Sequence, residues 1–193
     1  MFTVRIHGRG GQGAVTAAEV LSIAAFDEGK YSQAFPTFGS ERRGAPVVSS
    51  CRIDESPIRS HETIDRPDAL IILDPTLLSQ VKVFEGIGPD SYILINTTHS
   101  LDELGLVELA SGLHPGRVVS VPATDLAREH LGRPLPNAAL LGGFAALTGV
   151  VSVASILCAI HQRFQGPVGA ANAAAAKAAF DLVRDARGSI AHA

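Results

Sequence analysis

The stretch RIHGRGGQGA, residues 5–14, joins a short apolar run to the first helical pattern of the chain and contains four glycines. A glycine loses more backbone entropy on folding than any other residue, so a cluster of them indicates that the backbone itself comes close to another group. A glycine loop between a strand and a helix collects unpaired N–H groups and the positive end of a helix dipole at one point. The stretch therefore predicts a βα unit whose turn can hold an oxyanion or a phosphate.

Further units of this kind follow along the chain. Short apolar runs typical of strands covered on both faces occur at 69–74 (ALIILD), 92–96 (YILIN) and 117–122 (RVVSVP). Helical patterns occur at 14–29, 74–84 (DPTLLSQVKVF) and 123–132 (ATDLAREHLG). This alternation predicts an α/β fold with a mostly parallel, Rossmann-like sheet flanked by helices. The chain from Asn137 onward reads as a helical C-terminal third.

Composition limits the function classes. With 193 residues, 46% of them hydrophobic and 18% charged, the chain suits a single domain spanning 1–193. A net charge of −3 argues against a nucleic-acid-binding protein, which usually carries a basic stripe. Residues 2–6 (FTVRI) resemble a strand rather than a signal peptide, so we expect a cytoplasmic protein.

The uncharged segment 138–160 is long enough to cross a membrane. Its internal glycines and serines favour two buried helices instead, with Asn137 and Ser152 as their N-caps. We expect Cys51 and Cys158 to be reduced core residues, because two cysteines cannot hold an iron–sulfur cluster. The histidines show no metal-ligand spacing, and no set of nucleophile, base and orienting residue is apparent, so we assign neither a metal nor a catalytic residue.

The glycine loop satisfies the dinucleotide fingerprint G-x-G-x-x-G through Gly8, Gly10 and Gly13. The acidic residue that this fingerprint requires at the end of the next strand is missing, since Asp27 and Glu28 close the helix instead. Ordinary NAD binding is therefore not favoured, and a turn that only brings the helix close to the sheet remains an alternative. The Gln12 amide can donate to a ligand oxygen or remain solvated.

A second distinctive segment runs from Lys30 to Arg52, where we expect a long loop feeding a strand at PVVSSCRI. Within it, Arg42 and Arg43 either pair with Glu41 and solvent, or reach a phosphate with a guanidinium group. Asp74, at the end of an expected strand, is interpreted as the cap of the turn at Pro75 rather than as a catalyst.

Together, GRGGQG (residues 8–13) and FPTFGSERRGAPV (residues 35–47) resemble the gamma subunit of 2-oxoacid:ferredoxin (acceptor) oxidoreductases of the pyruvate:ferredoxin type. The likeness continues in DALIILDPTLL (68–78), in VPATDLAREHLGRPLPNAALLGGFAAL (121–147) and around Asn172, and so covers nearly the whole chain.

The resemblance implies a cytoplasmic hetero-oligomer of this gamma chain with alpha, beta and ferredoxin-like delta subunits, without nucleic acid or a membrane span. Such a complex oxidatively decarboxylates a 2-oxoacid to an acyl-coenzyme A and passes electrons to ferredoxin or another acceptor. Thiamine diphosphate, Mg and [4Fe-4S] clusters would lie on the partner subunits. The segment SERRGAPV (residues 40–47) is closer to pyruvate-like members than to 2-oxoglutarate members, and aromatic substrates such as phenylglyoxylate stay open.

The resemblance also implies that this chain contributes to the coenzyme A site. The residues expected there come from both loops: Gly8, Gly10, Gly11, Gln12, Gly13, Glu41, Arg42, Arg43 and Gly44. Two alternatives remain: a stand-alone Rossmann-like module whose Arg42 and Arg43 face the 2′-phosphate of NADP, and a scaffold whose glycine loop touches no ligand.

Overall fold

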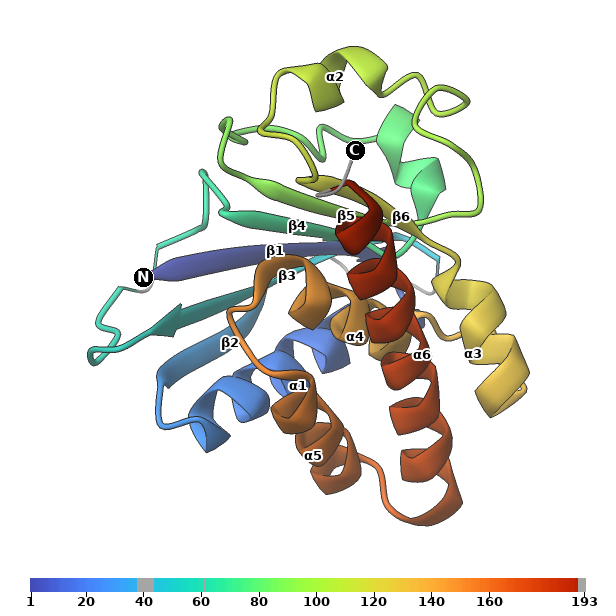
Figure 1. The fold of residues 1–193 in the computed structure, drawn as a ribbon. Helices are drawn as coiled ribbons and strands as arrows, with labels where there is room; N and C mark the ends of the chain where they lie inside the picture. The colour runs from blue at the N-terminus through green and yellow to red at the C-terminus, as the bar shows by residue number, and fades with distance from the viewer. Residues whose placement is uncertain (38–43, 61, 191–193) are drawn as a thin grey trace.

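Six strands form one sheet in the order β2-β3-β1-β4-β5-β6 (Figure 1). The computed structural model describes residues 1–37, 44–60 and 62–190. Four strands run parallel to one another: β1 (Phe2–Arg9), β4 (Ala69–Ile72), β5 (Tyr92–Asn96) and β6 (Val118–Val121). The expected mostly parallel sheet is therefore confirmed.

The other two strands form an antiparallel hairpin at one edge of the sheet. In it, β2 (Tyr31–Thr37) pairs with β3 (Pro46–Asp54), and β3 pairs antiparallel with β1. The strand expected at PVVSSCRI is confirmed as β3, but the long loop expected before it was wrong at residues 31–37, which form a strand. Pro36 obscured the pattern, but a proline is tolerated on an edge strand, where its missing N–H removes no ladder bond.

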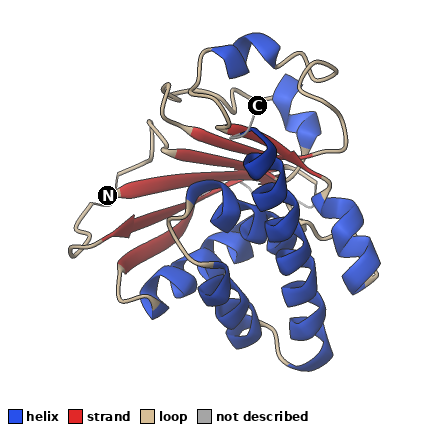
Figure 2. Ribbon diagram, viewed as in Figure 1, coloured by secondary structure: helices blue, strands red, loops and turns tan. Residues whose placement is uncertain are grey.

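Helices cover one face of the sheet as a thick layer, which Figure 2 shows as a group of blue ribbons against the red strands. This layer holds α1 (Ala14–Asp27), α4 (Asn137–Thr148), α5 (Val153–Arg163) and α6 (Gly166–Ile190), with α3 (Ala123–Leu131) beside α6. They pack on alternate strand residues such as Val4, Ile6 and Leu94. The C-terminal third is thus helical, as expected.

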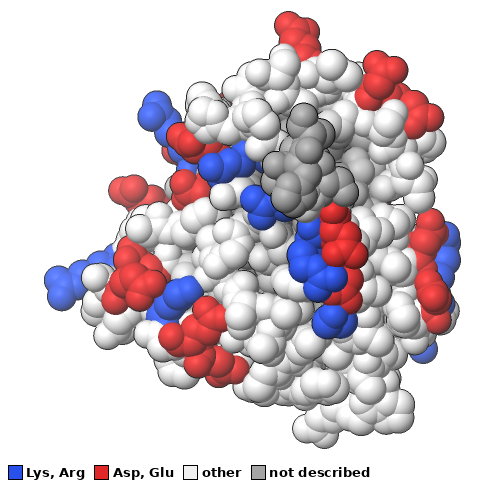
Figure 3. Space-filling model, viewed as in Figure 1, with Lys and Arg blue, Asp and Glu red and all other residues white. Residues whose placement is uncertain are grey.

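The opposite face of the sheet is covered more thinly. Here Leu70, Ile72 and Ile95 pack against Leu77 of the short 3₁₀ helix η1 (Pro75–Ser79) and against the region around α2 (Val107–Ser111). A regular helix was expected over 74–84, but the helical turns end at Ser79. On the helical face, basic and acidic side chains lie together in small groups (Figure 3). Within α6, Lys177 forms an ion pair with Asp181.

The apolar segment 138–160 forms two helices, α4 and α5, as predicted. The Ser152 hydroxyl caps α5 by accepting a hydrogen bond from the N–H of Ser155 at 3.1 Å. The same expectation for Asn137 was wrong, because Pro136 occupies the N-cap position and Asn137 is the first residue of the helix. In the described part of the chain, no helix combines the length and the apolar character that a membrane crossing requires.

The two cysteines differ in their exposure to solvent. Cys51 is buried, and this burial raises the pKa of its thiol to about 12. Cys158 is exposed on α5, so the expectation of two core cysteines was half wrong. The helical pattern around Cys158 places Ile156, Ala159 and Ile160 in the core and turns the thiol outward.

Glu28 links the end of α1 to the start of α5 through its side chain. Its replacement by glutamine is expected to lower the free energy of unfolding. Its carboxylate accepts a hydrogen bond from the Ser152 N–H at 2.7 Å and pairs with Lys30 at 3.1 Å. Burial alone raises the pKa of Glu28, but the bonds from Ser152, Ser155 and Lys30 lower it from 4.5 to about 2. Hydrogen bonds to a charged group are worth roughly 1.5–3 kcal/mol, and we expect a loss of this order at pH 7.

The effect of Glu28→Gln should depend on pH. Because the pKa is lower in the folded state, the stabilisation is complete above about 4.5 and disappears as the pH falls toward 2. Urea unfolding of both proteins at pH 7 and pH 3 measures this difference. Glu19→Gln is the matched control, since Glu19 also reaches α5 but pairs with Arg163 in a largely exposed contact worth about 0–1 kcal/mol. Equal losses of unfolding free energy in Glu28→Gln and Glu19→Gln would contradict the stabilising role assigned to Glu28.

Candidate functional site

The carboxyl ends of the parallel strands lie along one edge of the sheet. After β1 the chain continues to the hairpin of β2 and β3 on one side of β1, whereas β4 lies on the other side of β1. In open α/β sheets such a switch point is the usual position of a ligand site. The glycine loop follows β1 here, and Asp74 follows β4. The loop singled out in the sequence thus lies at the expected edge.

The glycine loop presents backbone donors to the cavity beside it. Gly11 and Gly13 have φ angles of 96° and 81°, which favour glycine, and Gly13 is the N-cap of α1. The N–H of Ala17 makes the first helical bond, to the Gly13 carbonyl at 2.9 Å. The N–H groups of the preceding turn, Ala14 to Thr16, therefore have no acceptor within the helix.

The two loops predicted to share a ligand are joined to one another. The Gly10 N–H donates to the Ala45 carbonyl at 2.9 Å, and the Gly44 N–H donates to the Gly10 carbonyl at 3.1 Å. The Arg9 guanidinium also donates to the Gly44 carbonyl at 3.0 Å. Glu41, Arg42 and Arg43 lie outside the described residues, between Thr37 and Gly44. Gly8 was also expected at the ligand site, and it lies in β1, close to Ala14 and Leu73.

A polar network behind the loop fixes its shape. The side-chain oxygen Oε1 of Gln12 accepts from the backbone N–H of Arg9 at 2.8 Å. The side-chain nitrogen Nε2 of Gln12 donates to the Asp74 carboxylate at 2.8 Å. Arg9 pairs with the same carboxylate at 3.1 Å. Both ends of the Gln12 amide are thus used within the chain, so its role is to hold the loop rather than to reach outward.

Asp74 caps the turn at Pro75, as expected, by accepting from the Thr76 N–H at 3.0 Å. It also joins the network through Gln12 and Arg9, which the sequence alone did not indicate. Burial raises the pKa of Asp74, but the hydrogen bonds from Thr76 and Gln12 and the charge of Arg9 lower it below its ordinary value. The residue therefore stays ionised and positions the loop.

A cavity of about 490 Å³ opens between the glycine loop and the segment that joins α3 to α4. Its walls are formed by residues of four elements and their connections: Gly11, Gly13, Thr16, Leu131, Arg133, Leu135, Asn137, Phe164, Val168 and Asn172. Asn137 is only 7% exposed, and its amide lies directly against Gly13. Among the residues that the structure describes, none forms a hydrogen bond with the Asn137 side chain.

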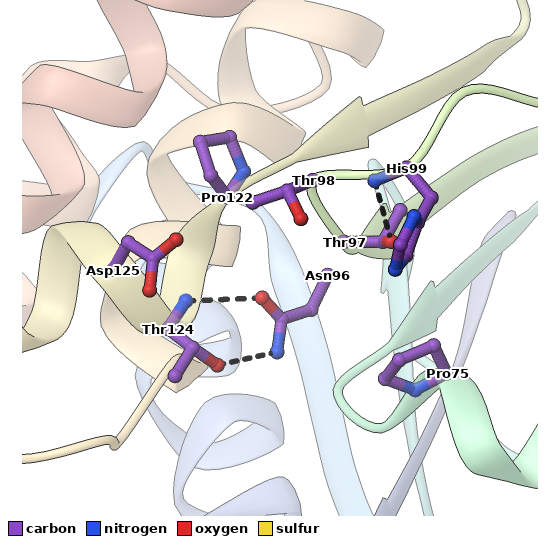
Figure 4. Close-up of a pocket in the computed structure, with 8 residues that line it drawn as sticks. All are labelled: Pro75, Asn96, Thr97, Thr98, His99, Pro122, Thr124 and Asp125. Atoms are coloured by element: carbon purple, nitrogen blue, oxygen red, sulfur yellow. Dashed lines mark hydrogen bonds between the residues drawn. The ribbon is translucent and has the colours of Figure 1, made fainter.

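A smaller hollow of about 230 Å³ lies farther along the same edge, at the ends of β5 and β6 (Figure 4). The Asn96 amide closes its floor, accepting from the Thr124 N–H at 3.0 Å and donating to the Thr124 hydroxyl at 2.8 Å. The Thr97 hydroxyl accepts from the His99 N–H at 3.0 Å. These bonds are internal and stabilise the two strand ends.

The family to which the chain belongs follows from comparison with known proteins. A model of the pyruvate ferredoxin/flavodoxin oxidoreductase family matches residues 3–182. The chain belongs to this family. It is similar to the pyruvate/ketoisovalerate oxidoreductases common subunit gamma of Pyrococcus abyssi, with 49% identity over 94% of this chain and 96% of that protein. The pyruvate synthase subunit PorC of Methanothermobacter marburgensis is 44% identical, over 95% of this chain and 98% of that protein.

A solved structure shows the same fold. The pyruvate oxidoreductase subunit PORC of Thermotoga maritima superposes with a TM-score of 0.78 and 34% identity, over 93% of this chain and 95% of that chain. The resemblance inferred from GRGGQG and FPTFGSERRGAPV is therefore confirmed. The chain is a gamma subunit in the pyruvate ferredoxin/flavodoxin oxidoreductase family, and so part of a multisubunit oxidoreductase.

The gamma subunit departs from a dinucleotide-binding domain at one decisive place. In the dinucleotide fold, the strand that follows the first helix lies next to β1 and supplies the acidic residue for the ribose. Here β3 lies between β1 and β2, and it runs antiparallel to both. The fingerprint glycines therefore occur without their usual neighbouring strand, which agrees with the missing acidic residue.

Among the cavity residues of the gamma subunit that were not predicted as site residues, three carry amide or guanidinium groups. Arg133 lies on the segment after α3, while Asn137 and Asn172 come from α4 and α6. Asn172 is 4% exposed and donates to the Val168 carbonyl at 2.8 Å. The available signal was the pair of asparagines inside apolar helices, since a buried polar side chain requires a partner.

Proposed function

We propose that this gamma subunit binds the phosphate-bearing end of coenzyme A in the cavity beside the glycine loop. The observation that carries the proposal is the buried Asn137 amide, which touches the Gly13 N-cap without a hydrogen-bond partner in the described residues. Because this amide lines the cavity and is not used by other described residues, it is available to bond a ligand there.

The chemistry of the cavity favours an anion attached to a larger, partly apolar body. The α1 N-terminus offers N–H groups and the positive end of a dipole, and Arg133 adds a cation at the rim. Leu131, Leu135, Phe164 and Val168 form apolar walls next to these donors. Coenzyme A combines phosphates with a long arm of amide and methyl groups, which matches both parts.

The neighbouring hairpin extends this proposed site. Gly44 and Ala45, which follow Glu41, Arg42 and Arg43 in the sequence, are hydrogen-bonded to Gly10 of the glycine loop. We propose that one of the two arginines contacts a phosphate of the same ligand. A guanidinium group is well shaped for such a contact because it can donate two parallel hydrogen bonds.

The remaining chemistry is assigned to the partners. We propose that residues 1–193 act as one cytoplasmic domain that helps to assemble alpha, beta and ferredoxin-like delta subunits. Those partners would hold thiamine diphosphate, Mg and [4Fe-4S] clusters and would pass electrons to ferredoxin or another acceptor. The 2-oxoacid would be pyruvate-like or aromatic, such as phenylglyoxylate, as the segment SERRGAPV suggests.

Asn137→Asp tests the cavity because it keeps the shape of the side chain and places a negative charge at the α1 N-terminus. We expect the assembled complex to bind coenzyme A at least tenfold more weakly, since charge-assisted contacts are worth roughly 1.5–3 kcal/mol. The KM for the 2-oxoacid should stay unchanged. Steady-state kinetics with each substrate varied in turn separates the two effects.

The matched control is Arg128→Ala, which removes an exposed cation of α3 that pairs with Asp125. This variant should bind coenzyme A like the parent. Arg42→Ala and Arg43→Ala extend the test to the hairpin, where at least one of them should weaken binding. If Asn137→Asp and both arginine variants keep the parent affinity, the loop is a scaffold and the proposal is wrong.

A further inference from the structure

Another cavity, of about 320 Å³, lies on the face of the sheet opposite the helical layer. It is bounded by β1 and β3 and by the chain around residues 63–64 and 77–85. Its walls are largely apolar, formed mainly by Val48, Ile64, Leu77 and Val81. The cavity is separated from the glycine-loop cavity by the sheet itself.

Polar side chains of two strands meet at its floor. Arg5 and His7 come from β1, and Ser50 comes from β3, directly opposite Arg5 in the register. The alternate residues Val4, Ile6 and Cys51 belong to the core under the helices. Because successive residues of a strand point to opposite faces, Arg5, His7 and Ser50 all point toward the cavity.

His7 presents a hydrogen-bond donor to this cavity. Its Nε2 accepts from Nε of Arg5 at 3.1 Å, so the ring proton of the neutral imidazole is on Nδ1. Burial, together with the charge of Arg5, lowers the pKa of His7 from 6.5 to about 4, and the ring is neutral at pH 7. His7 is 5% exposed, and nothing in the described parts of the chain accepts from its Nδ1.

Ser50 presents a second donor. It is 2% exposed, and within residues 1–37, 44–60 and 62–190 its hydroxyl has no hydrogen-bond partner. Both donors face the cavity and have no acceptor within the described residues, so they are available to a group bound there. They indicate a ligand that brings acceptor oxygens.

Arg5 brings a positive charge to the floor, with the carboxylates of Glu85 and Asp65 near enough to interact with it. The Arg5 guanidinium donates to the backbone carbonyls of Ile64, Val83 and Glu85, at 3.3, 2.9 and 2.7 Å. These neutral partners leave its charge uncompensated by a direct ion pair within the described residues. Lys82 and the Glu85 carboxylate are of opposite sign and both belong to the exposed rim.

We propose that this cavity binds a small aliphatic carboxylate. Its oxygens accept hydrogen bonds from Nδ1 of His7 and from the Ser50 hydroxyl, and its branched or linear alkyl group packs against the apolar walls. The volume is at the lower end of the range for small-molecule pockets, so it selects short chains. This site is independent of the coenzyme A proposal.

Saturation-transfer NMR of the assembled complex with isovalerate tests the site, with 3-methylbutan-1-ol as the neutral probe of equal size. We expect isovalerate to bind more tightly than the alcohol. Ser50→Ala should weaken isovalerate binding about 2- to 12-fold, the loss expected for one hydrogen bond of about 0.5–1.5 kcal/mol. Val48→Phe fills the cavity from a half-exposed strand position and should abolish this component of binding.

Ser49→Ala is the matched control, because Ser49 is equally buried but points to the helical layer from the next position of β3. It should bind isovalerate like the parent, and co-purification of all subunits confirms that each variant assembles. Isovalerate binding that persists unchanged in Ser50→Ala and Val48→Phe belongs to another site and overturns the proposal. A complex that does not bind isovalerate also overturns it, and would indicate that a partner side chain occupies the cavity.

Discussion

Gly142→Ala is expected to lower the free energy of unfolding by about 3 kcal/mol, at the upper end of overpacking substitutions. A Cβ at this position would lie 1.8 Å from the backbone carbonyl oxygen of Ala176 in α6. The obstacle is main chain and cannot rotate away, so α4 and α6 must separate. Because α4 is buried almost throughout, this separation would open the core under the sheet. Urea unfolding of the purified chain measures the loss.

Gly143→Ala is the control, since it changes the adjacent residue of the same helix. A Cβ there meets only side-chain atoms, the nearest being Leu94 Cδ2 at 3.4 Å, which is close to ordinary contact. An alanine favours a helix interior over glycine by up to about 1 kcal/mol, so this variant should equal or exceed the parent in stability. Similar losses in the two variants would contradict the close α4–α6 packing.

Gly13→Ala is expected to impair ligand binding more than any other single loop substitution. Gly13 has a φ of 81°, where alanine is strained by about 1–2 kcal/mol. Its Cβ would also lie 2.5 Å from Nδ2 of Asn137 and 3.0 Å from Cγ. The amide must therefore move away from the α1 N-terminus, so we expect coenzyme A binding at least tenfold weaker, since this removes donors from a charged group.

Gly11→Ala separates the effect of backbone strain from the effect of displacing Asn137. Gly11 has a similar positive φ of 96°, but a Cβ there meets nothing within 4 Å. It should lose comparable stability to strain but bind coenzyme A more tightly than Gly13→Ala does, because Asn137 keeps its place. Calorimetric titration of coenzyme A into assembled complexes with each variant gives the comparison. Equal affinities in both variants would remove Asn137 from the proposed site.

The repeated βα pattern predicted most of the fold because its strands are short apolar runs with glycine and proline boundaries. The segments 69–74 and 92–96 became β4 and β5 almost residue for residue. The hairpin strand β2 was missed because Pro36 and the polar residues around it resemble a loop. Its strand character arises from pairing with β3, which a local pattern does not contain.

The candidate site was predicted in part. The glycine loop and the second loop were recognised from their residue types, and the structure joins them through Gly10 and Gly44. Asn137 was interpreted as a helix cap, because the sequence does not show that α4 begins next to α1. That juxtaposition depends on how the C-terminal helices pack on the sheet, which is a property of the whole chain.

The contact between Gly13 and Asn137 also determines when, during synthesis of the chain, the proposed pocket can form. Domains emerge from the ribosome amino-terminus first, so the glycine turn exists long before α4 has been synthesised. A nascent chain that ends before α4 has neither the amide nor the wall of the proposed pocket. The free subunit would thus become able to retain a cosubstrate only when translation is nearly complete, shortly before it can meet its partners.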